Sequence, residues 1–302
     1  MSAPQCLTIY LDAPTLSVVT AGRHNFFRRL MDVITAQGWQ VNLAQSTLSA
    51  RLEAPAKEGF ALFHMEPPTH PAALTCRRTY VGAFWHIEAQ AERWLWPVAQ
   101  EVFDPETIDP VQAQRFVQNW KKRLYPAGFL PSDEGFAFIP LQGQLRAHRS
   151  FQAMSPVAMI EAALAQTGLP LVAGLHPKEI YTAEEIAALQ DLAQRHPRFR
   201  IYHGESAEAL RACSFVITQN SGLAFEGYFL RKPAVLFARS DFHHIAGSVP
   251  RDGVEGAFAA LQNAPDFDRY LYWFLQQRAI NAGRAECEAQ ILTALRGHGG
   301  PI

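Results

Sequence analysis

The sequence offers little to chemistries that depend on cysteine, on strong net charge or on a membrane span. Its four cysteines form neither a Cys-x-x-Cys pair nor a short His/Cys cluster, so we expect reduced thiols and no zinc site. The 27 basic and 28 acidic residues nearly cancel, which argues against sequence-independent binding to nucleic acid. There is no apolar run near the roughly 20 residues of a membrane helix, and no signal-peptide layout. We therefore expect a soluble cytoplasmic protein with no metal and no cofactor. Peripheral attachment at the inner face of the cytoplasmic membrane stays open.

What is present is enough apolar sequence for two ordinary cores: 302 residues, 48% of them hydrophobic. Near the N-terminus, the short apolar run Leu7 to Asp12 predicts a strand. Phe26 to Ile34 has apolar residues at helical spacing, and Trp39 to Leu43 and Phe60 to His64 predict two further strands. This order predicts a parallel βαβ unit.

A segment rich in turn formers, Pro126 to Gly135, predicts the domain boundary. We therefore expect one α/β domain over residues 1–130 and a second α/β domain over residues 136–302. The long helical pattern Tyr270 to Leu295 belongs to the second domain in this division, with the option that the last helix packs back on the first.

From Phe136 onward, short apolar strands alternate with amphipathic helices, a pattern typical of a doubly wound parallel sheet. Thr182 and Ser206 stand where helix N-caps belong, each with a glutamate shortly after it. The predicted fold is α/β, with two Rossmann-like domains that face a cleft. The parallel sheet is clearest in the C-terminal half. The expected strands are residues 136–140, 169–175, 199–203, 215–218 and 234–238.

Ligands of such sheets bind beyond the carboxyl ends of the strands, so the residues that follow each strand are the candidates for a ligand site. Four segments qualify: residues 140–144, 174–178, 203–205 and 219–222. The candidate nucleotide-binding residues are Gln142, His176, Pro177, Lys178, Glu205, Asn220, Ser221, Gly222 and Glu226.

The last of these segments carries the clearest signal. Ser221 and Gly222 open a helix, whose free N–H groups and positive dipole end suit a phosphate. Glu226, on the same helix, would reach a ribose or sugar hydroxyl. On the alternative interpretation, Ser221 only caps the helix and Glu226 is solvated. His176, held by Pro177, is a candidate to donate a hydrogen bond or a proton to the phosphate, although a lone histidine is more often structural.

In the N-terminal half, the alternation of Trp85-His86-Ile87-Glu88 puts His86 and Glu88 on one face of a strand. They are a candidate acid/base pair, although a surface strand edge would give the same pattern. Asp12 is a second candidate for a catalytic carboxylate. His243 and His244 are adjacent, point in different directions on regular backbone and lack an evident third ligand, so we expect no metal there.

The stretch from Arg211 to Phe242, which contains Thr-Gln-Asn-Ser-Gly, resembles the capsule polysaccharide biosynthesis proteins. Pro140-Leu-Gln142 and His176-Pro177 match further segments of that family in the same order, so the resemblance covers about Phe136 to Phe242. The family includes two-domain GT-B glycosyltransferases similar to transferases of 3-deoxy-manno-octulosonic acid (Kdo) from its cytidine monophosphate donor. Bacterial sialyltransferases share a similar His-Pro and a Ser-rich pair.

The resemblance implies that His176 and Pro177 contact the donor phosphate or cytidine, Ser221 and Gly222 the phosphate, and Glu226 the ribose. The sequence departs from the family's pattern in two places. Gly174-Leu175 stands where relatives carry a lysine before His-Pro, so Lys178 is the candidate replacement. Ser221-Gly222 stands where relatives have Ser-Ser.

The hypothesis from sequence is a metal-independent glycosyltransferase for capsule or surface polysaccharide. It would use a nucleotide-activated sugar, CMP-Kdo or a related donor, and a glycan or glycolipid acceptor. His176, His86 and Glu88 are its candidate catalytic residues. The alternatives are a nucleotide-sugar epimerase or hydrolase of the same fold, or a non-catalytic protein that binds sugar nucleotides or joins a polysaccharide-assembly complex.

Overall fold

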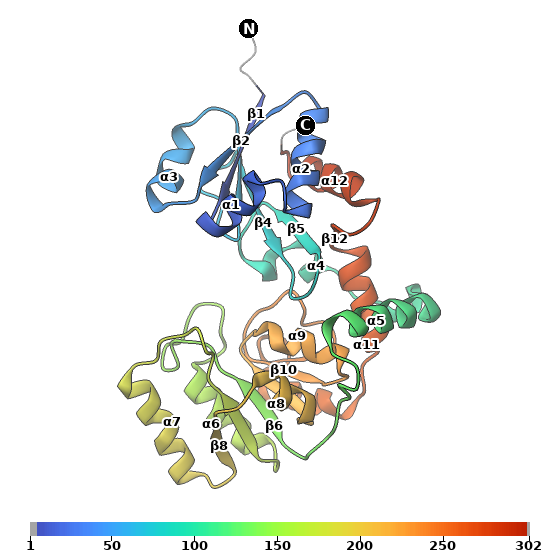
Figure 1. Ribbon diagram of the computed structural model, residues 1–302. Helices are drawn as coiled ribbons and strands as arrows, with labels where there is room; N and C mark the ends of the chain where they lie inside the picture. Colours follow the sequence, from blue (N-terminus) through green and yellow to red (C-terminus); the bar gives the residue numbers. More distant parts are fainter. Residues whose placement is uncertain (1–4, 301–302) are drawn as a thin grey trace. The chain divides into compact units, whose positions relative to one another are not determined.

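The computed structural model describes residues 5–300. Contacts divide this part of the chain into two compact units. The first unit runs up to Trp96 and resumes at Phe274, and the second comprises Pro97–Trp273 (Figure 1). Each unit contains its own six-stranded sheet with helices packed on it, so the α/β class predicted from the sequence is confirmed.

The sheet of the first unit has the strand order β12-β5-β4-β3-β1-β2. The strands β1 to β4 pair in parallel, whereas β5 and β12 add two antiparallel ladders at one edge. The predicted parallel βαβ start is therefore confirmed. The chain passes from β1 to β2 on one side and to β3 on the other, so the order reverses at β1. The strands are β1 (Cys6–Leu11), β2 (Gln40–Gln45), β3 (Phe60–His64), β4 (Ala73–Arg78), β5 (Phe84–Glu88) and β12 (Ile280–Asn281).

Helix α2 (Asn25–Ala36) shows how this unit builds its core. Phe26, Phe27, Leu30, Val33 and Ile34 recur at helical spacing and are buried, and Gly38 follows the helix end with φ 82°, a left-handed conformation that suits glycine. In Figure 1, α2 and α12 lie side by side, and they contact each other. The remaining helices of this unit are α1 (Ala13–Thr20), α3 (Leu48–Glu53), α12 (Cys287–Gly297) and two short 3₁₀ turns, Ala54–Ala56 and Arg93–Leu95.

The sheet of the second unit is parallel throughout, with the order β11-β10-β9-β6-β7-β8. The chain winds outward from β6 through β7 to β8, then returns to β9 beside β6 and winds the other way. This is the doubly wound order, and its reversal lies between β6 and β9. The strands are β6 (Ala137–Pro140), β7 (Leu171–Gly174), β8 (Phe199–Tyr202), β9 (Phe215–Thr218), β10 (Ala234–Leu236) and β11 (Gly247–Ser248).

The helices of the second unit begin largely where the sequence predicts. Thr182 caps α7 in a capping box with Glu185, as expected. The prediction for Ser206 is wrong: Glu205 is the N-cap residue of α8, without a side-chain hydrogen bond, and Ser206 is already helical. The helices are α4 (Pro97–Gln100), α5 (Pro110–Leu124), α6 (Pro156–Gln166), α7 (Ala183–Arg195), α8 (Ser206–Ala212), α9 (Gly222–Phe229), α10 (Val249–Ala259), α11 (Phe267–Leu271) and the 3₁₀ turns Pro105–Thr107 and Ala260–Gln262.

The C-terminal pattern Tyr270 to Leu295 is not one helix. Helix α11 passes into a π-helical turn, Tyr272–Gln277, and the short strand β12 then pairs with β5 before α12 begins. The apolar positions of this stretch serve two cores, because Tyr270 packs with Tyr228 whereas Ile280 and Ile291 lie in the core of the first unit. A change of packing partner explains the broken apolar stripe.

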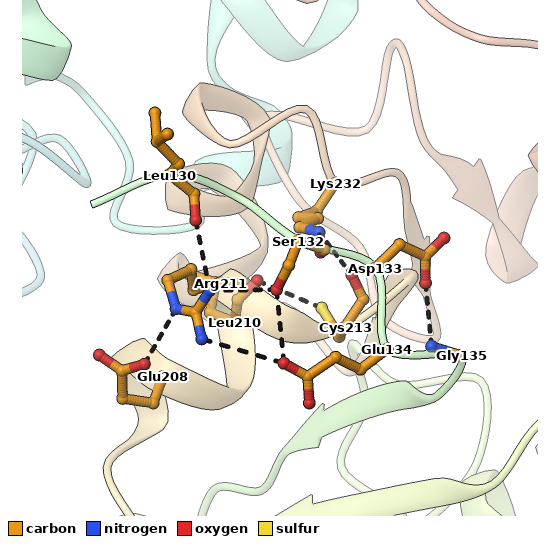
Figure 2. A network of polar contacts seen from close by, with 10 residues as sticks. All are labelled: Leu130, Ser132, Asp133, Glu134, Gly135, Glu208, Leu210, Arg211, Cys213 and Lys232. Carbon is orange, nitrogen blue, oxygen red and sulfur yellow. Dashed lines mark hydrogen bonds and ion pairs between the residues drawn. The ribbon is translucent and has the colours of Figure 1, made fainter. Parts of the chain in front are cut away.

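The turn-rich segment before β6 is bound tightly to the second unit (Figure 2). Arg211 donates to the Leu130 carbonyl and to the Ser132 hydroxyl, and the Ser132 N–H donates to the Arg211 carbonyl. The buried ammonium of Lys232 donates to the Ser132 and Cys213 carbonyls, at 2.5 and 2.6 Å. These contacts fix the path by which the chain enters β6.

The two compact units differ in extent from the predicted domains 1–130 and 136–302. Helix α5 packs on α11 and therefore belongs with the second sheet. Helix α12 contacts α2 and β5, which places the C-terminal segment with the first sheet.

Replacing Lys232 by methionine is expected to destabilise the second unit. The change removes two charged hydrogen bonds and leaves two buried carbonyls without a donor, at a cost of about 2–4 kcal/mol in the free energy of unfolding. Urea denaturation of Lys232→Met, with Lys122→Met on the exposed side of α5 as control, measures it. Equal midpoints for the two variants would contradict the structural role of Lys232.

Candidate functional site

The carboxyl ends of β6 and β9 meet at the strand-order reversal of the second sheet. Thr218, the last residue of β9, donates its hydroxyl to the Pro140 carbonyl at the end of β6, at 3.2 Å. The two segments that follow, Leu141 to Gln144 and Gln219 to Ser221, are therefore neighbours at the sheet edge where ligands of this fold bind. Two of the four segments predicted from the sequence are thus brought together.

Ser221 is the N-cap residue of α9. Its Oγ accepts a hydrogen bond from the Leu223 N–H at 3.3 Å, and its own N–H donates to the Thr218 hydroxyl at 3.4 Å. The side chain does cap the helix, as the alternative interpretation holds. The cap uses the hydroxyl only as an acceptor, so its O–H still has a proton to donate to an anion at the helix N-terminus.

The two residues before Ser221 tie this turn to its surroundings. Gln219 is 3% exposed and donates from Nε2 to the Met154 carbonyl at 3.1 Å. Asn220 donates from Nδ2 to the Arg239 carbonyl at 3.2 Å. The amide of Asn220 therefore holds the end of the neighbouring strand, and only the backbone of this residue lies directly beside the helix terminus.

The segment after β6 is anchored to the N-terminus of α7. The Leu145 N–H donates to the buried Glu185 carboxylate at 2.5 Å, while the Glu179 carboxylate lies where a side chain on Gly143 would stand. Gln142, which precedes Gly143, has a buried side-chain oxygen, Oε1, without a hydrogen-bond partner among residues 5–300. An acceptor of this kind is free to bind a ligand N–H or O–H.

His176 is exposed directly after β7, and its ring is oriented by local contacts. Nδ1 accepts a hydrogen bond from the Lys178 N–H at 3.2 Å, and the His176 N–H donates to the Tyr181 hydroxyl at 2.9 Å. Because Nδ1 is an acceptor, the neutral ring carries its proton on Nε2 and can donate it to a phosphate oxygen. Pro177 and Lys178 are also exposed.

Gly174, the last residue of β7, packs against the Phe138 ring. A side chain on Gly174 would press on the Phe138 ring, with a closest approach of 3.1 Å. A side chain at position 174 would therefore require the buried Phe138 ring to shift by a few tenths of an ångström.

The two predicted glutamates differ in their surroundings. Glu226 is half-buried, and this burial raises the pKa of its carboxyl group. The carbonyl of Glu226 accepts from the Tyr125 hydroxyl at 3.3 Å. Glu205 is exposed after β8, three strands from β9, or about 14 Å along the sheet edge at the usual strand spacing. Its assignment to the same ligand as Ser221 stays a prediction.

The first unit has its own pair of polar side chains where its strand order reverses. Asp12 follows β1 and His64 ends β3, and Oδ2 of Asp12 lies 3.3 Å from Nδ1 of His64. The sequence suggested Asp12 but missed His64. The sequence shows only that Asp12 comes directly after one apolar run and that His64 ends another.

Local contacts set the charge of this pair. Burial raises the pKa of Asp12, but hydrogen bonds from the N–H and hydroxyl of Thr15 and attraction to His64 outweigh it, so that pKa lies below its usual range. Burial lowers the pKa of His64, attraction to Asp12 opposes this, and the charges of His24 and Arg78 lower the pKa further. An ionised carboxylate beside a neutral imidazole is the arrangement of a general base.

The predicted pair His86 and Glu88 is also in contact, but both side chains are buried and neither lies on a surface strand edge. Oε1 of Glu88 lies 3.4 Å from Nδ1 of His86, and Oε2 lies 3.0 Å from Nε2 of His298. Burial raises the pKa of Glu88, but the hydrogen bonds from His298 and His86 outweigh it and keep that pKa below its usual range. The carboxylate thus links β5 to the residue after α12.

His243 and His244 stack on each other with ring centroids 4.5 Å apart. Each has a separate partner, since Nδ1 of His243 lies 2.8 Å from the Ser240 carbonyl and Nδ1 of His244 lies 3.0 Å from the Tyr270 hydroxyl. Over residues 5–300 there is no cluster of three or more His, Cys, Asp or Glu side chains arranged to hold a metal ion. In the same range, no helix is long and apolar enough to cross a membrane.

Solved structures of similar fold include Kdo transferases and UDP-GlcNAc 2-epimerases. The beta Kdo 2,7 transferase KpsC of Thermosulfurimonas dismutans aligns with 96% of this chain and 99% of its own, with a TM-score of 0.52 and 11% identity. The beta Kdo 2,4 transferase of the same KpsC covers 86% and 90%, with a TM-score of 0.44 and 12% identity. A Methanocaldococcus jannaschii UDP-GlcNAc 2-epimerase covers 97% and 100%, with a TM-score of 0.40 and 11% identity.

No family model and no curated protein matches the sequence. The likeness to the 2,7 transferase is one of fold, and it extends over both units. The resemblance to capsule polysaccharide proteins that the sequence suggests is thus supported at the level of the fold. The two-unit architecture of a GT-B-like protein is confirmed.

Removing the charge of Asp12 tests the pairing in the first unit. Asp12→Asn is expected to lower the pKa of His64 further, because attraction to the carboxylate is the largest influence that raises it. NMR titration of the His64 ring measures the shift, with Asp32→Asn on α2 as control. An unchanged or higher His64 pKa in Asp12→Asn would contradict the pairing.

His244 is expected to make the stability of the protein depend on pH. Burial, with the neighbouring His243, lowers its pKa to about 4, below the ordinary 6.5 of the unfolded chain. The folded state is therefore most favoured above pH 6.5 and loses of the order of 3 kcal/mol as pH falls toward 4. Denaturation at pH 7 and at pH 4 gives the free energy of unfolding at each pH. The difference between the two values should be smaller for His244→Gln than for wild type or for His203→Gln, the control at an exposed site. Equal differences would refute this assignment.

Proposed function

We propose that this chain is a metal-independent glycosyltransferase that uses a nucleotide-activated sugar to build capsule or surface polysaccharide, with CMP-Kdo or a related sugar acid as the first donor to test. The observation that supports it best is the pairing of β6 with β9, which joins Pro140 to Thr218, so that the segments carrying Gln142 and Ser221 start from neighbouring strand ends. The name of the 2,7 transferase that shares this fold supports the choice of reaction.

In this proposal the second unit binds the donor. The Ser221 hydroxyl and the first turn of α9 bind the phosphate, where fixed donors stabilise the charge that grows as the glycosidic bond breaks. The Nε2–H of His176 donates to the same phosphate, with Pro177 and Lys178 beside it. Glu226 accepts from ribose hydroxyls, and Gln142 accepts from a donor N–H or O–H. Asn220 positions the turn.

The first unit would bind the glycan or glycolipid acceptor and remove its proton. Two carboxylate–histidine pairs are available, and Asp12–His64 suits the task better because Asp12 is 54% exposed whereas His86 and Glu88 are both buried. Asp12 would fix the tautomer of His64, whose Nε2 would accept the proton of an acceptor hydroxyl. The pair His86–Glu88 is the second candidate.

Binding of CMP, UMP and GMP to wild type and to Ser221→Ala, His176→Ala and Glu226→Gln tests the donor site. Each variant should weaken binding by about 10-fold or more, because each removes a hydrogen bond to a charged or strongly polar group. Calorimetric titration measures the affinity. Unchanged affinity in all three variants would refute the site.

Folding must be checked for Ser221→Ala, because loss of the cap alone costs about 1 kcal/mol. Thr47→Ala is the matched control, since Thr47 caps α3 of the first unit in the same way, at 3.1 Å from the Ala50 N–H. It should lose comparable stability and keep full nucleotide affinity.

Turnover separates catalysis from binding alone. Asp12→Asn and His64→Gln are expected to lower kcat by about 10²- to 10⁴-fold while nucleotide affinity stays unchanged. The rate of CMP release from the donor, with and without acceptor, measures kcat. Nucleotide binding without turnover in wild type would favour a non-catalytic protein, and acceptor-independent donor breakdown would favour a hydrolase.

A further inference from the structure

Two arginines beside the α9 turn have no carboxylate partner. Eight arginines of residues 5–300 lie in ion pairs with carboxylates, and Arg149 and Arg239 are not among them. Two cations at one edge of one sheet are available to a ligand of opposite charge. The paired arginines are Arg28, Arg29, Arg51, Arg195, Arg211, Arg231, Arg251 and Arg269.

The backbone of Arg239 is fixed next to the proposed phosphate turn. The pairing of β10 with β9 continues past the end of the strands, because the Phe237 N–H donates to the Thr218 carbonyl and the Ala238 N–H to the Gln219 carbonyl, at 2.8 and 3.1 Å. Arg239 comes next, and its carbonyl accepts from Asn220. Its side chain is exposed.

Arg149 is linked to Arg239 through Phe151. Its guanidinium lies over the Phe151 ring at 4.8 Å from the centroid, and the Phe151 carbonyl accepts from the Arg239 N–H at 2.9 Å. One residue therefore connects the two arginines. They approach the turn from the segments after β6 and after β10, the two strands that flank β9.

Two buried N–H donors, one on Arg149 and one on Gln152, have no acceptor among residues 5–300. Gln152 is 6% exposed, and its Oε1 accepts from the Arg149 N–H at 2.8 Å, which fixes the orientation of the amide and leaves Nε2 as a donor. Neither this Nε2 nor the Nε of Arg149 has a hydrogen-bond partner among residues 5–300. Native chains rarely leave buried donors unmatched, so the pair indicates an acceptor that the chain itself does not supply.

We propose that Arg149, Arg239 and Gln152 form a subsite for a second anionic group of the donor, beyond the phosphate held at Ser221. This inference rests on the proposed function and narrows its substrate class. The group is an oxyanion, either a second phosphate, as in a nucleoside diphosphate sugar, or the carboxylate of a sugar acid joined to a nucleoside monophosphate. Arginine suits both through paired N–H donors.

Calorimetric titration with matched probes tests the subsite. CDP against CMP measures the second phosphate, CMP-N-acetylneuraminic acid against CMP measures the sugar carboxylate, and pyrophosphate alone measures the anion without a nucleoside. In wild type, at least one of the two larger probes should bind about 10-fold more tightly than CMP. Which one does so identifies the donor class.

Arg149→Ala, Arg239→Ala and the double variant should lose that advantage and keep their affinity for CMP. Arg200→Ala, which removes an exposed arginine from β8, should retain it. Arg239→Lys should recover only part of the loss, because lysine keeps the charge without the paired donors.

The outcomes separate the two proposals. If CMP binds but no larger probe is favoured, or if the advantage survives in the double variant, the subsite is wrong and the proposed function stands. If no nucleotide binds but pyrophosphate binds to wild type and not to the double variant, the anion site stands and the proposed function fails. If wild type binds none of the probes, both fail.

Discussion

The parallel pairing of β6 with β9 is the contact from which the candidate donor site follows. The chain winds outward from β6 and returns beside it as β9. From the ends of these two neighbouring strands, the chain continues toward opposite edges of the sheet, to β7 after β6 and to β10 after β9. Thr218 joins these ends through its hydroxyl, accepting from the Ser221 N–H and donating to the Pro140 carbonyl. A change that separated β6 from β9 would part Gln142 from the N-terminus of α9.

In both units, burial and a few hydrogen bonds decide which individual groups carry charge or can bind an anion. The net charge gives no field to attract a polyanion, so anion binding depends on individual groups such as Ser221, His176 and the arginines beside the α9 turn. In the first unit, burial keeps His64 neutral while Thr15 keeps Asp12 ionised. The two members of the pair thereby differ in charge despite their contact, as a carboxylate–histidine base requires.

Much of the second sheet could be predicted from the sequence, because its strands are short apolar runs that alternate with helices of regular period. The turn at Ser221 could be placed for the same reason. Contacts between residues far apart in sequence could not. Nothing near Glu88 indicates that His298 binds its carboxylate, and nothing near Phe60 to His64 indicates that His64 meets Asp12. Such pairs depend on strand order, which periodicity does not reveal.

The stretch after Tyr270 illustrates the same limit. Its apolar residues fit a helix locally, yet they are divided between two cores, and the strand β12 inside it exists only because β5 offers an edge. The segment before β6 is a second case: its turn formers suggest a free linker, but Arg211 and Lys232 bind it to the second unit. In both places tertiary contacts override the local pattern.

A crystal structure of the protein soaked with cytidine monophosphate tests the central claim most directly. The account predicts the phosphate within hydrogen-bond distance of the Ser221 hydroxyl and the first turn of α9, with the ribose near Glu226. Density for the nucleotide at any other edge of the two sheets, or a phosphate that contacts neither Ser221 nor Gly222, would contradict it.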